Sequence, residues 1–383
     1  MIVGLLKETY PNEKRVAVVP EGIATLKKAG IEVQLESGAG ENAGFTDKKY
    51  QEAGGKVVLD RTEIFSNSDV ILQVRGIGID MDSSSSDLSM LKPDQLIIGF
   101  FDPFFNIEAI KELARRNVCT LAMELIPRIS RAQPMDALSS QSNIAGYKAA
   151  IIAAEMLPRM FPMMITAAGT ITPSRVLVIG AGVPGLQAMA TCRRLGAVVS
   201  AYDIRPAVKE QVESLGAKFI ELKLETKESE QEYGYAKEMD EDFYTKQRNI
   251  MKDIVAENDV IITTASVPGK KAPILITSDM VDAMKPGSVI VDIACAQGGN
   301  CELTETGKVI IRNGITITGP LNIPSSVPYH SSKMYSKNII NLLLLMVEEG
   351  KLNLNVDDQI IRDSIVTMNG QIVNKQVREI FGL

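Results

Sequence analysis

Histidine is nearly absent from this sequence, since His330 is the only one among 383 residues. A zinc site built on several histidines is therefore excluded, and we expect no metal. Acid–base catalysis by histidine is excluded as well unless His330 itself carries it, although lysine, aspartate or tyrosine can also act as bases. Tryptophan is absent and aromatic residues make up only 5% of the chain, which argues against a stacking platform for nucleic acid.

Positive charge is also in short supply. Lysine and arginine number 41 against 47 aspartates and glutamates, and the net charge of -6 disfavours binding to a phosphate backbone.

No apolar run approaches the ~20 residues of a membrane-spanning helix. The N-terminus has no basic region before its apolar residues, so it is typical of a first strand rather than of a signal peptide. No C-x-x-C pair occurs, which favours reduced, structural thiols of a cytosolic protein for Cys119, Cys192, Cys295 and Cys301.

Short apolar runs alternate with helical patterns over residues 1–125, which predicts a parallel sheet with helices on its faces. The predicted strands are Ile2–Leu6, Val16–Val19, Ile31–Leu35, Val70–Val74, Leu96–Phe100 and Val118–Met123. Helices are expected at Glu21–Ala29 and Ile107–Arg116, and the serine run Ser83–Ser86 is interpreted as a loop.

A polar loop at residues 126–135 interrupts this rhythm, and one long helix from Asp136 to Met160 is expected to connect two lobes. A second alternating unit follows, with helices starting near Pro184, Arg205, Tyr244 and Ser278. Its predicted strands are Arg175–Ile179, Val198–Tyr202, Phe219–Leu222, Val260–Thr263 and Ser288–Asp292.

A helix near Ser331–Val347 is long enough to return the chain to the first lobe. The predicted fold is therefore α/β, with two Rossmann-like, doubly wound parallel-sheet domains separated by a cleft. The first domain comprises residues 1–137 and 329–383, and the second comprises residues 138–328. The highly charged segment 223–253 is either a solvated helix pair or a mobile flap.

The strongest local motif is Gly180-Ala-Gly182-Val183-Pro-Gly185, a G-x-G-x-x-G pattern between a hydrophobic strand and a helix. The glycines allow a tight turn and a close approach of the backbone to a pyrophosphate, and the helix N-terminus offers free N–H groups. The motif alone is weak, because a purely structural glycine turn has the same letters. The strand, the turn, the helix and a following strand that ends in an acid together indicate dinucleotide binding.

That acid is Asp203, 18 residues beyond Gly185 at the end of the next strand. A carboxylate there accepts hydrogen bonds from the adenosine ribose and repels a 2′-phosphate, which favours NAD(H) over NADP(H). Arg205 is the contrary observation, since a nearby arginine could accept that phosphate. Its alternative interpretation is a solvent-facing cation at the start of the next helix.

Hydride exchange with an alcohol or amine substrate needs a base, whereas exchange between two nicotinamides moves only a hydride. A sequence with one histidine, outside the expected cleft strands, fits the second case better.

The chain resembles a known family over essentially its whole length: the NAD(H)-binding component, domain I, of proton-translocating nicotinamide nucleotide transhydrogenase. The segments that carry the resemblance are Arg128-Ile-Ser-Arg-Ala-Gln-Pro-Met-Asp-Ala-Leu-Ser-Ser-Gln-Ser-Asn-Ile-Ala-Gly-Tyr147, the glycine motif with the following Leu-Gln, Gly234-Tyr-Ala-Lys-Glu-Met239 and Pro286-Gly-Ser-Val-Ile-Val-Asp-Ile-Ala-Cys-Ala-Gln-Gly-Gly299.

Alanine dehydrogenases share this fold and are the main competitor. They carry a substrate-binding lysine and a catalytic histidine in the first lobe, and an aspartate before Gln-Gly-Gly. Here Arg75 replaces the lysine, the stretch Gly99–Phe105 has no histidine and Ala296 replaces the aspartate, although Arg15 is retained. These departures favour transhydrogenase.

The resemblance implies roles for individual residues. Arg128, Gln133 and Asp136 match the family's Arg-Gln-Asp loop, which positions the nicotinamide end of NADH, and Ser139 is its neighbour on the following helix. Without the resemblance, this segment is equally a capped interdomain loop in which Asp136 is an N-cap and Arg128 a surface charge.

The remaining expected NAD(H) contacts surround the glycine motif or follow later strands. Tyr235, with Gly234, lies in the family's mobile loop, and Gln247 and Ser266 fall near the adenosine; on sequence alone Gln247 is also consistent with a helix-surface amide. The full expected set is Gly180, Gly182, Val183, Gly185, Asp203, Ile204, Arg205, Gly234, Tyr235, Gln247, Ala265 and Ser266.

By resemblance, the membrane domain and the NADP(H)-binding domain lie on partner subunits. This chain is then a separate peripheral subunit on the cytoplasmic face of the inner membrane, expected to be a homodimer that does not bind nucleic acid. Its hydride would pass from NADH to NADP+ on the partner, coupled to proton translocation. The alternatives are an NAD-dependent alanine or amino-acid dehydrogenase and a non-catalytic NAD sensor.

Overall fold

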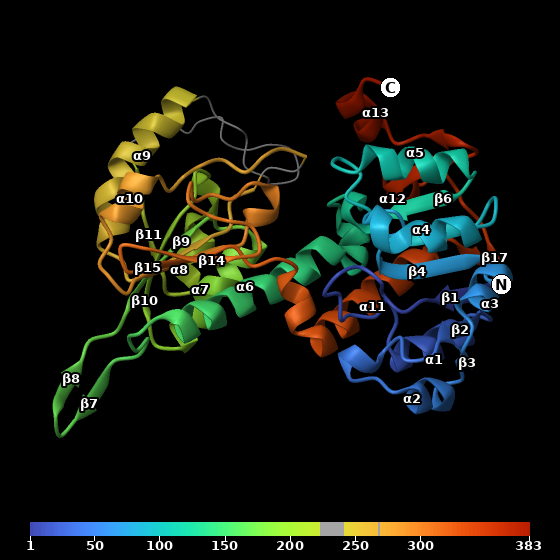
Figure 1. Ribbon diagram of the computed structural model, residues 1–383, viewed down its shortest axis with the longest axis horizontal. Helices are drawn as coiled ribbons and strands as arrows, with labels where there is room; N and C mark the ends of the chain where they lie inside the picture. The colour runs from blue at the N-terminus through green and yellow to red at the C-terminus, as the bar shows by residue number, and fades with distance from the viewer. Residues whose placement is uncertain (223–240, 267–268) are drawn as a thin grey trace. The chain divides into compact units, whose positions relative to one another are not determined.

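The computed structural model describes residues 1–222, 241–266 and 269–383, which divide into two compact units. Unit 1 comprises Met1–Gln141 and Pro324–Leu383, and unit 2 comprises Ser142–Ile323. The domain boundaries expected from the sequence lie after residues 137 and 328. Helix α6 (Ala137–Met156) carries the chain from unit 1 into unit 2. Each unit contains its own mostly parallel sheet with helices on both faces, which confirms the predicted fold class (Figure 1).

Unit 1 is built on an eight-stranded sheet whose middle strands are parallel. Near-continuous runs of Val, Ile and Leu form these strands because both faces are covered. In spatial order the strands are β19 (Gln371–Ile372), β18 (Ile365–Met368), β6 (Cys119–Ala122), β5 (Leu96–Phe100), β4 (Val70–Arg75), β1 (Ile2–Leu5), β2 (Glu32–Glu36) and β3 (Lys56–Val58). β18 and β19 pair antiparallel and extend the sheet beyond β6.

Two hydrophobic clusters separate the faces of this sheet. Alternate residues of β4 divide between them, since Leu72 belongs to one cluster and Ile71 to the other. The first face is covered by α1 (Pro20–Lys28), α2 (Asp47–Glu52), α11 (Pro328–Leu345) and α12 (Gln359–Ser364), and the second by α3 (Arg61–Asn67), α4 (Met81–Met90), α5 (Ile107–Arg115) and α13 (Lys375–Phe381). Unit 1 also contains η1 (Glu41–Ala43), η2 (Met123–Leu125), η3 (Ser130–Met135), β16 (Val347–Glu348) and β17 (Lys351–Leu352).

The predicted strand Val16–Val19 is wrong, because this segment is buried but joins no sheet. Side chains of α11 hold its backbone instead: the N–H of Val16 donates to Ser332 Oγ at 3.0 Å, and that of Val19 to Ser336 Oγ at 3.2 Å. The Tyr50 hydroxyl donates to the carbonyl of Val18 at 2.8 Å. Buried backbone groups must be paired, and here side chains replace a neighbouring strand.

Three other predictions of local structure also need correction. The serine run Ser83–Ser86 lies inside helix α4 rather than in a loop. The long helix α6 ends at Met156, four residues earlier than expected, just before the Leu157-Pro158 pair that disfavours helical backbone. The strand predicted at Phe219–Leu222 is shorter and begins one residue earlier, as β11 (Lys218–Phe219).

Unit 2 contains a seven-stranded sheet that is parallel except for one edge strand. Its spatial order is β11, β10 (Val198–Tyr202), β9 (Arg175–Ile179), β12 (Val260–Thr263), β13 (Val289–Asp292), β15 (Ile315–Thr318) and β14 (Val309–Arg312). The last two strands were not predicted. One face packs against α6, α7 (Val183–Arg194) and α8 (Lys209–Ser214), and the other against α9 (Glu241–Ala256) and α10 (Ser278–Asp282). The chain also forms the short 3-10 turns η4 (Pro206–Val208), η6 (Cys295–Gln297) and η7 (Ile323–Ser326).

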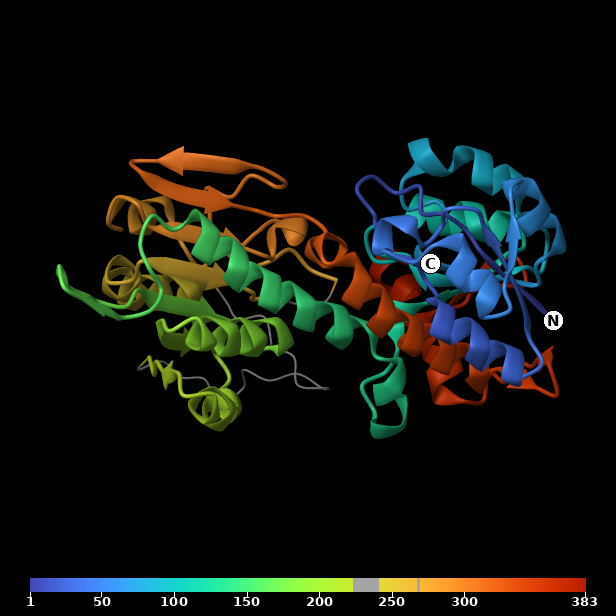
Figure 2. The same cartoon turned by 90° about the horizontal axis from the view of Figure 1, so that it is seen from below.

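A separate two-stranded hairpin, β7 (Met164–Thr166) with β8 (Gly169–Ile171), extends from unit 2 beyond its sheet (Figures 1 and 2). All six strand residues are exposed. Among the described residues no helix is long and apolar enough to cross a bilayer. The four cysteines are buried and unpaired, and burial raises the pKa of Cys295 and Cys301 to about 11.

The support of Val16 by α11 predicts a measurable stability effect. Ser332→Ala leaves the buried N–H of Val16 without an acceptor, which costs about 1–3 kcal/mol. Urea unfolding followed by circular dichroism should show a clearly lower midpoint. Ser66→Ala is the control, because the exposed Ser66 hydroxyl donates only within its own helix, and its midpoint should be unchanged. Equal midpoints for Ser332→Ala and the wild type would contradict this account.

Candidate functional site

The strand order of unit 2 changes direction at β9, whose neighbours β10 and β12 lie on opposite sides. Ligands of open α/β sheets bind at the carboxyl ends of the strands where the order reverses. The glycine motif follows β9 directly, and Thr264, Ala265 and Ser266 follow β12. The fold therefore brings these two parts of the sequence-predicted site to the same edge of one sheet.

Two glycines of the motif are required by the protein itself. Gly180 has a φ of 99°, and a Cβ there would lie 2.6 Å from Thr264 Oγ1. A Cβ on Gly185 would lie 1.9 Å from the carbonyl oxygen of Gly180, so helix α7 could not start where it does. The Thr264 hydroxyl donates to that same carbonyl at 3.1 Å and ties the two loops together.

Gly182 differs from these two, because none of the described residues requires a glycine there. Its φ of -77° suits any residue, and among the described atoms an added Cβ would meet only the Cδ atom of Pro184, at 3.8 Å. The space beside Gly182 is open and adjoins the N-terminus of α7, where backbone N–H groups and the helix dipole favour an anion. A loop with this space at a helix N-terminus has the geometry that a dinucleotide phosphate requires.

Asp203 lies at the end of β10 and its carboxylate is almost fully used by the protein. One oxygen accepts from the N–H of Ala181 at 2.7 Å and from Arg205 Nη2 at 2.7 Å. The other accepts from the backbone N–H and from Nε of Arg205, both at 2.9 Å. The acid predicted to bind the ribose thus also holds the glycine loop in place.

Arg205 is not the solvent-facing cation considered in the sequence analysis. Only 9% of the residue is exposed, and its guanidinium pairs with Asp203 through two nitrogens. Its neighbour Ile204 is partly buried and packs against the core beneath α9 and α10. An arginine that already donates to a carboxylate is a poor donor to a 2′-phosphate, because the ion pair would have to break first.

Gln247 on α9 is buried rather than a helix-surface amide, with 2% of the residue exposed. Its Nε2 donates to the Tyr202 hydroxyl at 2.8 Å. Its Oε1 is buried and has no hydrogen-bond partner among the described residues. A buried amide oxygen without a donor is costly, and a donor on a bound ligand, such as an adenine amino group, would satisfy it.

A residue that the sequence analysis did not select, Asn300, braces the loop after β12. Its side chain accepts from the Ala265 N–H at 3.0 Å and donates to the Ala265 carbonyl at 2.9 Å. Asp292, fully buried, accepts the backbone N–H groups of Asn300 and Cys301. No spacing rule points to either side chain, so the sequence offered no signal for this support. Ser266 follows Ala265 and is exposed.

The predicted nicotinamide loop lies in unit 1 and forms the 3-10 helix η3. Residues three apart are eclipsed in such a helix, and Ala132 and Met135 are the buried pair. Gln133 is consequently turned outward, and Arg128, just before η3, is exposed as well. The loop therefore presents an amide and a guanidinium on its outer side.

Asp136 caps helix α6, as one of the two sequence interpretations proposed. It accepts the N–H of Ser139 at 2.8 Å and the Ser139 hydroxyl at 2.6 Å. This contact fixes both side chains at the first turn of α6 and stabilises the helix.

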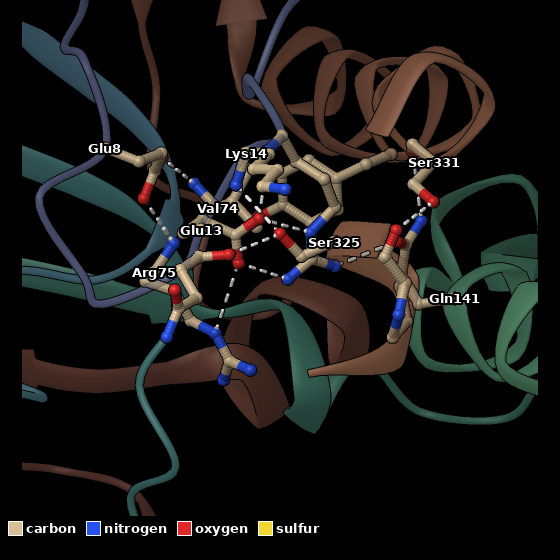
Figure 3. A network of polar contacts seen from close by, with 12 residues as sticks. Glu8, Glu13, Lys14, Val74, Arg75, Gln141, Ser325 and Ser331 are labelled. Carbon is tan, nitrogen blue, oxygen red and sulfur yellow. Dashed lines mark hydrogen bonds and ion pairs between the residues drawn. The ribbon is translucent and has the colours of Figure 1, made fainter. Parts of the chain in front are cut away.

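Unit 1 has its own point of strand-order reversal, between β1 and β4, and buried polar side chains fill it (Figure 3). Glu13 accepts from Nε and Nη2 of Arg15 at 2.7 and 2.6 Å, and Arg15 Nη1 donates to Gln141 at 2.8 Å. Arg75 lies 3.7 Å from Glu13 and stacks on Tyr10 at 5.0 Å. Arg15, retained from the alanine dehydrogenase pattern, is therefore engaged by the protein itself.

Two carboxyl groups beside this cluster have strongly raised pKa values. Burial, followed by the charge of Glu13, raises the pKa of Glu8 to about 8 although the group accepts two backbone N–H groups. Burial, followed by the charge of Asp102, raises the pKa of Glu124 to about 8. Glu124 accepts the N–H groups of Phe101 and Asp102 at the end of β5.

The rest of the described chain contains few other groups that could form a functional site. No group of three or more histidine, cysteine or acidic side chains there could hold a metal ion. A cavity of about 490 Å³ lies at the amino ends of the unit 1 strands, lined by residues such as Asp69, Lys92 and Lys351. His330 is exposed in the first turn of α11. The predicted contacts Gly234 and Tyr235 lie outside the described residues.

Comparison with known proteins gives the family. Models for the N-terminal and C-terminal domains of "Alanine dehydrogenase/PNT" match residues 4–145 and 149–375. The chain belongs to the alanine dehydrogenase/PNT family. The family resemblance stated from the sequence is thereby confirmed.

Within the alanine dehydrogenase/PNT family the chain is more similar to transhydrogenases than to alanine dehydrogenases. It is 46% identical to the first part of the NAD(P) transhydrogenase alpha subunit of Rickettsia prowazekii, over 99% of this chain and 98% of that protein. For alanine dehydrogenase 2 of Staphylococcus aureus the identity is 26%, over 100% of this chain and 96% of that protein. A solved transhydrogenase structure from Sinorhizobium meliloti is 41% identical with a TM-score of 0.85, covering 98% of this chain and 100% of that one.

The contrast between Gly182 and Gly185 predicts two distinct outcomes in this family member. Gly182→Ala should leave the unfolding free energy within about 0.5 kcal/mol of wild type. It should nevertheless weaken NADH binding roughly tenfold, because the methyl group enters the ligand space. Gly185→Ala should destabilise the protein by about 3 kcal/mol, since its Cβ overlaps the Gly180 carbonyl. Unfolding curves and NADH titration by fluorescence measure both. Unchanged NADH affinity in Gly182→Ala would contradict the assignment.

Proposed function

We propose that this chain is the NAD(H)-binding subunit of a proton-translocating transhydrogenase. It holds NADH while a hydride passes directly to NADP+ carried by the NADP(H)-binding domain of a partner subunit. The observation that supports this most is the open space at Gly182, at the strand-order reversal of unit 2. High identity to transhydrogenase alpha subunits supports the assignment over the amino-acid dehydrogenases.

The residues of unit 2 are proposed to bind the adenosine and pyrophosphate portions. Gly180, Gly182, Val183 and Gly185 place backbone N–H groups of the α7 N-terminus toward the phosphates. Asp203 accepts from the adenosine ribose once Arg205 yields one of its bonds, which favours NAD(H) over NADP(H). Further contacts are assigned to Ile204, to Gln247 through its Oε1, which has no partner in the described part of the chain, and to Ala265 and Ser266 after β12. Gly234 and Tyr235 remain predictions.

The loop of unit 1 is proposed to hold the nicotinamide end. Arg128 and Gln133 present donors on its outer side, and Asp136 with Ser139 fixes the turn that follows. The dihydronicotinamide supplies the hydride from its C4 atom, and NADP+ accepts it. The NADH ring is thereby oxidised, the NADP+ ring is reduced and no proton is transferred. The chain's contribution is orientation, which alone accounts for a large part of many rate enhancements.

Partner subunits embedded in the membrane are proposed to carry proton translocation, with this chain peripheral on the cytoplasmic face. We also propose a homodimer, supported by the exposed hairpin β7–β8. A two-stranded hairpin is marginal in water alone. Met164, Ile165 and Ile171 nevertheless expose apolar side chains on it, which a second copy of the chain would cover.

The hairpin predicts the effect of a charge on assembly. Ile165→Asp should convert a dimer into a monomer, because a buried carboxylate at an apolar interface is strongly unfavourable. Ile311→Asp is the matched control: Ile311 is 74% exposed and Ile165 is 76% exposed, but Ile311 lies on the edge strand β14. Sedimentation velocity should show a dimer for the wild type and the control. A dimer for Ile165→Asp, or a monomeric wild type, would overturn the proposal.

Reconstitution tests the catalytic assignment. The chain is mixed with a transhydrogenase NADP(H)-binding domain, and hydride transfer from NADH to an NADP+ analogue is followed by absorbance. Gln133→Asn withdraws the amide by one methylene, and we expect the transfer rate to fall by roughly 100-fold while NADH affinity is mostly kept. An unchanged rate would remove Gln133 from the site.

Two rival functions are distinguished by the same preparation. An alanine dehydrogenase would oxidise NADH with pyruvate and ammonia without any partner, and substantial turnover would defeat the proposal. A non-catalytic NAD sensor would bind NADH yet never reduce the NADP+ analogue in the presence of the partner domain.

A further inference from the structure

The turn that carries Gln133 is tied to a helix more than two hundred residues away in the sequence. The carbonyl of Pro134, the residue after Gln133, accepts a hydrogen bond from Asn338 Nδ2 at 2.8 Å. It accepts a second, from Asn341 Nδ2, at 3.2 Å. Both asparagines belong to α11, and residues three apart lie on one face of a helix. All of these residues lie in unit 1.

Asn338 makes a second contact that Asn341 does not. The Ser140 hydroxyl donates to Asn338 Oδ1 at 2.7 Å, and Ser140 lies in the first turn of α6. One side-chain amide therefore bridges the carbonyl just after Gln133 and the helix turn just after Asp136. Reversing the amide would set its oxygen against the Pro134 carbonyl, so the contact with that carbonyl fixes its orientation.

Burial separates the two asparagines further. Asn338 is 8% exposed, whereas the contact of Asn341 is exposed to water and longer. The loop is also held by an ion pair of Arg131 with Asp358. This pair is solvent-exposed as well and contributes little to stability by itself. The buried amide of Asn338 is the contact best able to fix the turn.

We propose that Asn338 is a positioning residue for hydride transfer, acting through the backbone of the turn at 133–136. It keeps Gln133 and Asp136 in fixed positions relative to each other without contacting the nicotinamide. This inference rests on the proposed function. Small displacements of a positioning group cost large factors in rate, because transfer requires close and aligned rings.

Asn338→Asp tests the proposal with almost no change in shape. The aspartate keeps an acceptor for Ser140 but replaces the donor that faces the Pro134 carbonyl with an oxygen. At pH 8 we expect hydride transfer in the reconstituted system to fall at least tenfold, with the Kd for NADH within about threefold of wild type. Asn341→Asp is the matched control, since it changes the exposed partner of the same carbonyl, and its rate should fall less than twofold.

The pH profile separates positioning from general damage. Once protonated, the carboxyl that Asn338→Asp introduces would again donate to the Pro134 carbonyl, so the rate of this variant relative to wild type should rise as the pH is lowered. A merely destabilised protein would not regain its rate in this way. Asn338→Ser serves if Asn338→Asp fails to fold, and its rate should fall at least tenfold at every pH.

The outcomes distinguish this inference from the function on which it rests. Wild-type rates for Asn338→Asp at pH 8 beside a slow Gln133→Asn would overturn the positioning role alone. Wild-type rates for both variants would overturn the assignment of the loop as well. A loss in Asn338→Asp that is entirely a loss of NADH affinity, with no change in the transfer rate of the saturated protein, would also contradict the proposal.

Discussion

The structure depends on one constraint: backbone N–H groups at the carboxyl ends of parallel strands run out of partners in the sheet and still must be paired. Buried carboxylates at the ends of neighbouring strands accept hydrogen bonds from these N–H groups. Glu8, after β1, accepts two such groups at the end of β4, and Glu124, after β6, accepts two after β5. In unit 2 Asp203 does the same for the loop after β9, and Asp292 for the loop after its own strand.

This constraint gives the acid of the glycine motif two roles. Asp203 stabilises the loop through the Ala181 N–H, and in the proposed function it also selects the non-phosphorylated coenzyme. Arg205 covers both of its oxygens, so the buried charge is paired. Of the acid's partners, the arginine side chain is the one able to move aside for a ribose, because the others are backbone groups.

Much of this could be predicted from the sequence, because buried parallel strands and a glycine turn leave clear patterns. The strands at Leu96–Phe100 and Val260–Thr263 have the predicted bounds. Val16–Val19 has the same apolar composition, and only the distant hydroxyls of Ser332 and Ser336 show why it is no strand. The supporting asparagines could not be predicted for the same reason, since they act through single contacts across long sequence separations. The assigned roles of the site residues stay predictions.

The central claim is that this chain orients a dihydronicotinamide and leaves proton chemistry to other subunits. The most direct test uses NADH with deuterium at the transferred position of C4, mixed with this chain, the NADP(H)-binding domain and NADP+. The account predicts that the deuterium passes completely to NADPH, with none lost to water. Deuterium released to solvent, or absence of any transfer to NADP+, would contradict it.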